Sequence, residues 1–323
     1  MVPDAALLER FRVDLDALIE PSGRIGLAVS GGPDSLALLL LAAAARPGTV
    51  EAATVDHGLR PGCRGEAETV AALCERLGVP HSILAVKWDL PPASAIQEQA
   101  RTVRYGALAE WMGELGLTAL LTAHHLDDQA ETFVMRLTRG SGVRGLGAMR
   151  PSGPLPGRPE LRLLRPLLGW RRAELEKICA DAQLSPAIDP SNADERHERV
   201  RVRRALTDQD WLDPEALARS ARNIAAADEA LDWAAEREWS EFVEVHDDRI
   251  VYRASTAPVE IIRRVVARVI AELGSEGDPD ELRGREMDRL IEDLQNCNST
   301  TLRGVRCKGG LDWTFSPAPP RAN

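Results

Sequence analysis

The stretch LAVSGGPDSLALLL, residues Leu27–Leu40, places a short polar loop between two apolar runs. The run before the loop, Ile25–Val29, has the length and composition of a buried β-strand. The run after it, Leu36–Ala45, is about half of the ~20 residues that a membrane span needs, so it predicts a buried helix. A strand that leads through a glycine loop into a helix is typical of a parallel sheet, whose carboxyl edge binds ligands. The stretch therefore predicts a ligand site on an α/β fold.

Strand-like and helix-like segments alternate around this loop. Short apolar runs predict strands at Ile25–Val29, Val50–Val55, Ser82–Val86 and Ala119–Ala123. Helical patterns occupy residues 7–20, Ser35–Ala45, Gly65–Leu77, Ser94–Leu115, Asp127–Leu137 and Trp170–Leu184. This alternation predicts an α/β domain with a parallel sheet and helices on both faces. The segment Gly140–Gly157, rich in glycine, proline and arginine, is expected to be a mobile surface loop.

The pattern changes after Leu206, which predicts two domains with the limits 1–206 and 207–323. The expected elements of the second domain are a long helical region, a strand, a helix and a β-hairpin, at Pro214–Val245, Arg249–Ser255, Val259–Leu273 and around Gly309-Gly310. We therefore expect a smaller, mainly helical second domain with a terminal hairpin.

Length and cysteine usage restrict the class of protein. The 323 residues suffice for about two domains of ~100–200 residues each. The five cysteines are scattered without CxxC or CxxH spacing, which argues against a zinc site, an iron–sulfur site and a disulfide framework. The N-terminus does not resemble a signal peptide. We therefore expect a cytoplasmic protein without a membrane partner; a homodimer is compatible with the sequence.

The charge is unevenly distributed along the chain. The net charge of −10 by itself disfavours a nucleic-acid partner. Between Phe133 and Arg172, however, lie nine arginines and a single acid, Glu160, and a second basic cluster covers Arg196–Arg204. An acidic protein with basic segments can bind a polyanion locally. The alternative is that these arginines are solvated and have acidic neighbours in space.

The loop itself has the composition of an anion site. Its glycines expose backbone N–H groups, and the start of the following helix adds partial positive charge. The serine hydroxyls are further donors, whereas Asp34 would repel a bare phosphate and so predicts a bridging Mg²⁺. Phosphate with Mg²⁺ is the expected occupant, bound by Ser30, Gly31, Gly32, Pro33, Asp34 and Ser35.

The loop is neither a Walker A motif nor a GxGxxG motif, because the spacing and the terminal Gly-Lys-Ser/Thr are missing. The pattern SGGxDS instead resembles the pyrophosphate loop of the PP-loop ATPases, which split ATP between its α and β phosphates. The resemblance implies that the loop grips the departing pyrophosphate while AMP moves to the substrate. A plain serine–glycine turn that caps a helix is the alternative.

Further motifs select among the PP-loop ATPases. They are, in chain order, VDHGLR (Val55–Arg60), ARTVRY (Ala100–Tyr105), TAHHLDDQAET (Thr122–Thr132), RGSGVRGLGAM (Arg139–Met149), RPLL (Arg165–Leu168) and DPSN (Asp189–Asn192). With SGGxDS, this set resembles the tRNA(Ile)-lysidine synthase family in its short form, over about Ile25–Arg203 and more weakly beyond. The resemblance implies a Rossmann-like first domain of the adenine nucleotide alpha hydrolase type and a tRNA-binding second domain.

The resemblance also implies a ligase reaction and roles for individual residues. ATP adenylates C2 of the wobble cytidine in a CAU-anticodon tRNA(Ile), and the amine of L-lysine then expels AMP and leaves lysidine. The implied catalytic residues are Asp34, Arg104, Asp128 and Glu131, of which Asp34 contacts Mg²⁺ and the i, i+3 pair Asp128 and Glu131 holds lysine. ATP binding extends to Asp56, His57 and His124. The implied tRNA contacts are Arg139, Arg144, Arg165, Arg199 and Arg201.

Simpler structural roles stand beside these. Adjacent histidines point to different faces, so His124 and His125 are read as one nucleotide contact and one structural residue rather than a metal pair. The alternative role for Asp127 is to cap the helix that starts beside it. The arginines at 199, 201 and 203 are alternatively paired with Glu195 or Glu198. Val200 stands where family members usually carry Asn, which puts one polar contact in doubt but not the reaction.

Two other functions remain open at this point. A PP-loop tRNA thiolase is disfavoured by the missing CxxC and by the carboxylates of HHxDDQAET. A non-catalytic ATP sensor is disfavoured by the same carboxylates, because a sensor needs no second-substrate site.

Overall fold

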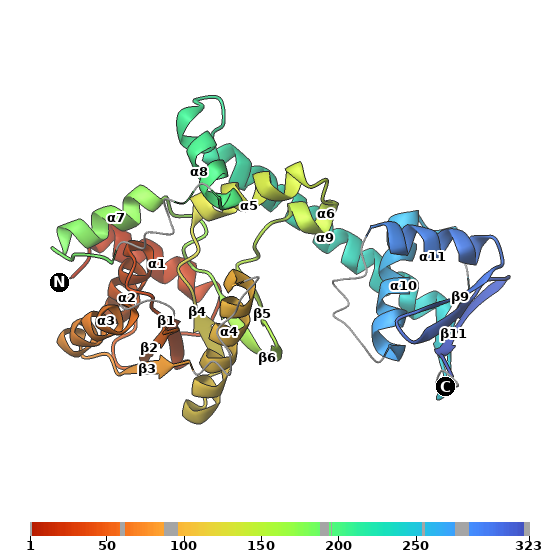
Figure 1. Cartoon of the computed structure of the whole chain (residues 1–323), viewed down its shortest axis with the longest axis horizontal. Coiled ribbons are helices and arrows are strands. Elements are labelled where there is room, and N and C mark those ends of the chain that lie inside the picture. Colours follow the sequence, from red (N-terminus) through yellow and green to blue (C-terminus); the bar gives the residue numbers. More distant parts are fainter. Residues whose placement is uncertain are drawn as a thin grey trace. The chain divides into compact units, whose positions relative to one another are not determined.

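The computed structural model describes residues 2–58, 62–86, 96–187, 194, 196–253, 256–274 and 284–319. By its internal contacts the chain divides into two units, Met1–Ala225 and Ala226–Asn323 (Figure 1). The division falls within one long helix, α9 (Pro214–Phe242). The start of that helix belongs to the first unit because Ala221 is buried against Phe133 and Ala148. The predicted domain boundary after residue 206 stays a prediction, and it precedes this division by the first turns of α9.

The first unit is built on a six-stranded sheet with the order β3-β2-β1-β4-β6-β5. Its strands are β1 (Ile25–Ala28), β2 (Val50–Asp56), β3 (His81–Ala85), β4 (Ala119–Leu121), β5 (Ser152–Leu155) and β6 (Arg158–Leu164). All neighbours pair in parallel except β5, which is antiparallel to β6. The predicted α/β class and the four predicted strands are confirmed.

Helices cover both faces of this sheet (Figure 1). One face carries α1 (Ala5–Asp16), α2 (Pro33–Ala45), α3 (Cys63–Leu77) and α7 (Arg172–Asp181), and the other carries α4 (Ile96–Leu115). The apolar helix α2 is buried on all sides from Ser35 to Ala42, as a helix without a polar face must be. The remaining helices of the unit are α5 (Leu126–Thr138), α6 (Val143–Leu146) and α8 (Glu198–Asp208). Among the described residues, none of the helices is long and apolar enough to span a membrane.

The strand order places two loops side by side at the carboxyl edge of the sheet. The chain leaves β1 towards β2 and β3, and then returns to β4 on the other side of β1. The loops after β1 and β4 therefore flank the point where the strand order reverses, which is where open α/β sheets bind ligands. These two loops carry the SGGxDS and HHxDDQAET motifs.

The expectation of a mobile loop over Gly140–Gly157 is wrong. This segment contains the short helix α6 and the strand β5, which forms a hairpin with β6. The turn between the two strands contains Gly157 at φ +76°, a conformation that glycine adopts without strain. The strand was missed because Gly153 and Pro154 lie within it, and its order depends on pairing with β6 rather than on local sequence.

The second unit combines helices with an antiparallel sheet of the order β7-β8-β11-β10-β9. Its elements after α9 are β7 (Val243–Val245), β8 (Ile250–Arg253), α10 (Val259–Leu273), α11 (Arg285–Gln295), β9 (Ser299–Leu302), β10 (Val305–Lys308) and β11 (Asp312–Pro317). The predicted strand and the hairpin turning at Gly309-Gly310 are confirmed, as the pairing of β10 with β11 shows. The description as mainly helical is incomplete, because β7 and β9 extend these strands into a five-stranded sheet.

A glycine in β1 makes room for an aromatic ring of α4. A Cβ atom on Gly26 would lie 2.9 Å from Cζ3 of Trp111, a buried side chain that has little space to move. We expect Gly26→Ala to lower the free energy of unfolding by about 1–3 kcal/mol through overpacking. Urea denaturation followed by circular dichroism measures this loss.

The matched control for this substitution is Gly113→Ala on the same helix α4. Beyond its chain neighbours and the backbone of its own helix, a Cβ on Gly113 would meet no atom of the described residues within 4 Å. Alanine in an exposed helix position is favoured over glycine by up to about 1 kcal/mol, so the stability of this variant should be unchanged or higher. An equal loss of stability in both variants would contradict the packing explanation.

Candidate active site

The loop between β1 and α2 has the shape of an anion-binding loop. Gly31 has φ +85°, and Gly32 is the N-cap of α2, so this helix end has no capping side chain. The buried Ser35 hydroxyl accepts the Ser30 N–H at 3.1 Å and donates to the Gly32 carbonyl at 2.9 Å. Ser35 thus fixes the loop from within, whereas Ser30 is exposed on it. The free N–H groups at the start of α2 are suited to phosphate oxygens.

Asp34, in the first turn of α2, has a carboxylate oxygen without a protein partner. Its Oδ1 is buried and forms no hydrogen bond within the described part of the chain. Its Oδ2 lies 3.6 Å from Nε2 of His125, on the neighbouring loop. A lone carboxylate oxygen beside a phosphate cradle fits Mg²⁺, which takes one or two carboxylates and completes its shell with phosphate oxygens and water.

His125 joins the two loops, a role that the sequence did not reveal. It is the N-cap of α5, where Nδ1 accepts the Asp128 N–H at 3.3 Å and the Asp128 carboxylate accepts the His125 N–H at 3.1 Å. In the neutral ring the proton therefore lies on Nε2, which is 3.5 Å from Asp128 Oδ2 and 3.6 Å from Asp34 Oδ2. Burial opposes charge on this ring, but the contacts with Asp34, Asp128 and Asp127 outweigh it and raise the pKa of His125.

His124 points to a different environment. Its Nδ1 lies 2.9 Å from the Thr122 hydroxyl. Burial above all, together with the charges of Arg165, Arg101 and Arg199, lowers the pKa of His124 to about 4 despite the opposing charge of Asp128. The imidazole is therefore neutral at pH 7, a state suited to hydrogen bonding with a nucleotide. These charges also show that arginines from three other segments surround the end of β4.

Asp127 connects α5 to α7 and does not cap its own helix. Its carboxylate accepts hydrogen bonds from Arg171 at 3.0 Å and from the Arg172 backbone N–H at 2.8 Å. Burial would raise the pKa of Asp127, but these two hydrogen bonds lower it below the ordinary value. The alternative role of Asp127 as a helix cap is therefore wrong, because His125 is the N-cap of α5 and the Asp127 carboxylate is bound by α7 instead.

Asp128 and Glu131 lie on one face of α5, but their carboxylates differ in what they contact. Glu131 is 2% exposed and accepts a hydrogen bond from Arg203 at 2.6 Å, with Arg199 at 3.5 Å. Asp128 has 14% of its side chain exposed and contacts His125. Of the predicted lysine-holding pair, Glu131 is therefore already neutralised by arginines of α8, and Asp128 is the carboxylate nearer to open space.

The arginines of α8 have different partners because they lie on different faces of the helix. Arg199 and Arg203, four residues apart, reach Glu131, whereas Arg201 donates to the Arg196 carbonyl. The suggested partners were Glu195, which lies outside the described residues, and Glu198, which pairs with Arg139. Arg203 was not among the predicted site residues, and the i, i+4 relation to Arg199 was the signal that identifies it.

The end of β2 contributes the third side of the site. The Asp56 carboxylate accepts the Gly58 N–H at 3.0 Å. Burial and the charge of Arg104 lower the pKa of His57 against the opposing effect of Asp56, which shows that Arg104 of α4 lies beside this strand end. The last residues of VDHGLR, and the DPSN motif, lie outside the described residues.

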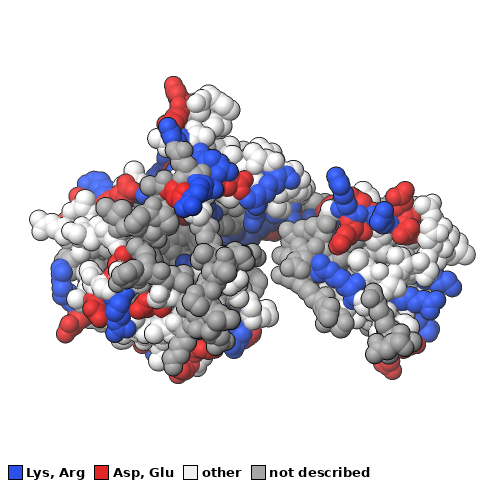
Figure 2. Space-filling view, in the orientation of Figure 1, with Lys and Arg blue, Asp and Glu red and all other residues white. Residues whose placement is uncertain are grey.

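The predicted tRNA-binding arginines lie on several segments of the first unit. Arg139 and Arg144 flank a turn held by Arg136, which donates to the carbonyls of Gly145 at 2.7 Å and Ala148 at 3.1 Å. Figure 2 shows blue Lys and Arg side chains mixed with acids on the first unit above the large grey area. Arg165 donates to the Arg150 carbonyl at 2.8 Å.

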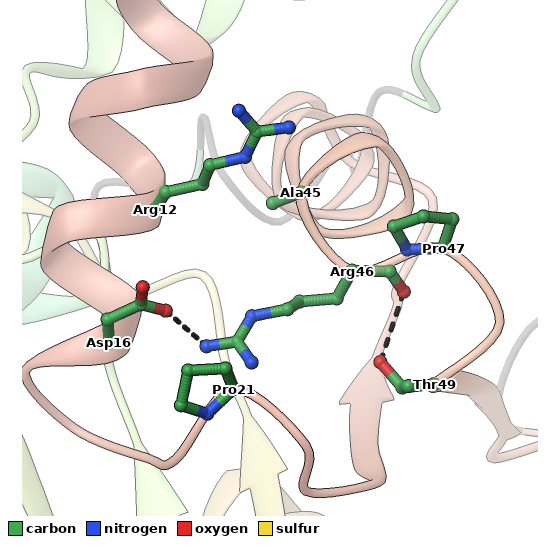
Figure 3. A pocket seen from close by; sticks show the side chains of 7 residues that line it. All are labelled: Arg12, Asp16, Pro21, Ala45, Arg46, Pro47 and Thr49. Carbon is green, nitrogen blue, oxygen red and sulfur yellow. Dashed lines mark hydrogen bonds and ion pairs between the residues drawn. The ribbon is translucent and has the colours of Figure 1, made fainter.

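Two cavities lie at opposite edges of the sheet. The first, of about 590 Å³, adjoins the loop at Gly31 and is lined by α3 and by residues near Ala187, whose N–H donates to the Gly31 carbonyl at 2.9 Å. The second, of about 330 Å³, lies between α1 and the end of α2 (Figure 3). There the buried Arg46 already donates to Asp16 and to the Glu20 carbonyl. Only the first cavity adjoins the residues predicted for the site.

Comparisons with known proteins agree with this arrangement. A family model described as a PP-loop domain matches residues 7–210. The tRNA(Ile)-lysidine synthase of Novosphingobium aromaticivorans is 47% identical over 312 residues, covering 96% of this chain and 93% of that protein. The tRNA(Ile)-lysidine synthase of Zymomonas mobilis is 42% identical, covering 93% of this chain and 90% of that protein.

A solved structure shows a similar fold. The U34-tRNA thiolase NcsA from Methanococcus maripaludis aligns with a TM-score of 0.57 and 17% identity, over 69% of this chain and 80% of that one. This likeness concerns the fold alone. From the matching family model and the near-full-length identity to its curated members, the chain belongs to the tRNA(Ile)-lysidine synthase family of PP-loop proteins.

Proposed function

We propose that this chain is an ATP-dependent ligase that converts the wobble cytidine of a CAU-anticodon tRNA(Ile) into lysidine. The observation that carries the proposal is the juxtaposition of Asp34 and Asp128 through His125 across the point where the strand order reverses. One carboxylate belongs to the phosphate loop and the other to the helix predicted to hold lysine. We infer that both steps of the reaction, adenylation by ATP and attack by lysine, take place at this one site.

The first half-reaction is adenylation. The C2 oxygen of the cytidine attacks the α-phosphate of ATP, and the bond between the α and β phosphates breaks. The loop Ser30–Ser35 and the start of α2 hold the departing pyrophosphate through backbone N–H groups. Mg²⁺, when bound at Asp34, neutralises charge on the phosphates. The adjoining cavity of about 590 Å³ has the volume of a small-molecule pocket, and Asp56, His57 and His124 are the residues proposed to contact ATP.

The second half-reaction joins lysine to the base. The amino group of L-lysine attacks C2, the C2–oxygen bond breaks, and AMP leaves with the oxygen. Asp128 attracts the lysine ammonium and is placed to accept the proton that the amine must lose. Glu131 acts at the same site, and in this structure it orders Arg203 and Arg199. Arg104 is proposed to face the reacting phosphate or base.

The tRNA contacts proposed are Arg139, Arg144, Arg165, Arg199 and Arg201. They lie at the end of α5, on α6, after β6 and on α8, all in the first unit. Their charge gives local attraction for the RNA backbone on a protein whose net charge is −10.

The state of the three buried thiols argues against their use in the thiolase alternative. Burial raises the pKa of Cys74 and of Cys307 to about 12, and burial together with the charge of Asp34 raises the pKa of Cys179 to about 11. Cys179 donates its thiol proton to the Pro33 carbonyl under the phosphate loop. Thiols in this state stay protonated and are poor nucleophiles or metal ligands.

Pyrophosphate release tests the proposed function against its alternatives. We expect release with ATP, Mg²⁺ and an unmodified tRNA(Ile) transcript, and AMP formation only after lysine is added. A thiolase would require a sulfur donor in place of lysine. A nucleotide sensor would bind ATP without releasing either product.

A further inference from the structure

Two arginines of α4 lie beside one buried aromatic ring. The guanidinium carbons of Arg101 and Arg104, both on α4, lie 4.9 and 5.9 Å from the centroid of the Tyr105 ring. Tyr105 is 4% exposed, so its ring is a fixed platform. Arg165, directly after β6, interacts electrostatically with the same residues: burial lowers its pKa, Tyr105 opposes this, and the charge of Arg101 lowers it further. We refer to Arg101, Arg104, Arg165 and Tyr105 as the Tyr105 cluster. Burial and the charge of Arg101 also lower the pKa of Arg104.

No carboxylate among the described residues pairs with these arginines. Arg165 donates to the Arg150 carbonyl at 2.8 Å, but its Nε is buried and finds no hydrogen-bond partner in the described part of the chain. Like charges held together beside a buried, unsatisfied donor are unfavourable in the absence of an anion. The guanidinium fork matches the oxygens of a phosphate group. The Tyr105 cluster therefore has the chemistry of a phosphate site.

The position of the cluster favours a phosphate of the RNA over one of ATP. The phosphate loop and the start of α2 already supply donors for ATP, and they follow β1. The cluster instead lies on α4 and after β6, and Arg101 is exposed. Arg165 follows β6, which pairs with β4, and the charges of Arg165 and Arg101 help to lower the pKa of His124 at the end of β4.

We propose that Arg101 and Arg165, supported by the ring of Tyr105, clamp a phosphodiester group of the RNA next to the nucleotide that reacts. Arg104 forms the inner wall of the same clamp, towards His57. The proposal rests on the proposed function for the identity of the RNA. It adds Arg101 to the residues that bind the RNA and gives Arg165 a defined partner, a single phosphodiester.

The salt dependence of RNA binding tests the clamp. The probe is the unmodified anticodon stem-loop of the CAU tRNA(Ile), measured by fluorescence anisotropy between about 50 and 200 mM KCl. Each neutralised phosphate contributes about 0.7 to the slope of log K against log [salt] on a single strand. We expect Arg101→Gln and Arg165→Gln each to reduce this slope by about 0.7 and to weaken binding about tenfold, with the ATP affinity unchanged.

Two further variants separate the clamp from general charge and from folding. Arg158→Gln removes the same charge at the start of β6, at the other edge of the sheet, where Arg158 pairs with Glu160; its slope should equal that of the wild type. Arg165→Lys keeps the charge but loses the fork, so it should keep the slope and still bind more weakly. Arg101 is exposed, so Arg101→Gln should fold normally even if Arg165→Gln does not.

These binding experiments distinguish failure of the proposed clamp from failure of the proposed lysidine reaction. A fall in ATP affinity with an unchanged RNA slope would assign the phosphate to ATP and overturn the proposal. Unchanged binding of both ligands in Arg101→Gln, with altered thermal stability, would show a structural cluster and overturn it as well. A reduced slope in a protein that fails to incorporate lysine would support the clamp and reject the proposed reaction.

Discussion

Asp34→Asn should reduce ATP-dependent pyrophosphate release by about 10³-fold. The substitution is isosteric but removes the negative charge placed for Mg²⁺ at the start of α2, where Oδ1 has no partner among the described residues. Charge stabilisation by a metal is worth several kcal/mol, and about 1.4 kcal/mol corresponds to a tenfold change in rate. The measurement is the steady-state rate of pyrophosphate release with the tRNA(Ile) transcript and lysine, at several Mg²⁺ concentrations.

The Mg²⁺ titration shows whether Asp34 acts through the metal. The variant should need more Mg²⁺ for half of its maximal rate. Its thermal unfolding should stay close to that of the wild type, because Oδ1 has no hydrogen bond among the described residues and the asparagine oxygen can keep the contact with His125. A full rate with an unchanged Mg²⁺ requirement would remove Asp34 from the metal site.

Asp128→Asn should raise the KM for lysine by about 10- to 150-fold while leaving the ATP affinity intact. A hydrogen bond to a charged group is worth about 1.5–3 kcal/mol, which gives this range. Asparagine keeps an oxygen that accepts the His125 N–H, so the capping box at the start of α5 should survive. Initial rates of AMP formation at varied lysine concentrations measure the effect.

The neighbouring residue provides the matched control. Asp127→Asn removes one charge from the same helical turn, but the Asp127 carboxylate is bound to Arg171 and to the Arg172 backbone N–H. This variant should therefore lose stability and keep the wild-type KM for lysine. A similar rise in KM in both variants would mean that lysine binding depends on the total charge of this turn and not on Asp128 itself.

The local part of the fold was predictable because its pattern is contiguous. The segment from β1 through the loop into α2 carries its strand, its glycines and its apolar helix in one stretch, and its predicted limits lie within two residues of those observed. The hairpin of β5 and β6 was not predictable, since Gly153 and Pro154 are poor strand formers and order comes from pairing. In the second unit, β7 has three residues and β9 reads STTL, which leaves no apolar alternation to detect.

The sequence proposes individual residues for the site but does not show how they are connected. The motifs identified Asp34, Asp128 and Glu131, but the ion pair of Glu131 with Arg203 joins residues that are 72 positions apart. The sequence predicted one nucleotide contact and one structural residue for His124 and His125, and it offered Asp127 as the cap of α5, whereas His125 is the N-cap. Histidine is not among the residues that usually mark this position. The sequence shows which side chains carry chemistry, whereas the strand order decides which of them meet.

The most direct test of the account is the incorporation of labelled lysine into an unmodified CAU-anticodon tRNA(Ile) transcript, with ATP and Mg²⁺. The methionine tRNA that shares the CAU anticodon is the parallel substrate. We expect label in the isoleucine tRNA alone, released as lysidine on nucleoside digestion. Absence of label from both tRNAs, by a protein that still binds ATP, would contradict the account.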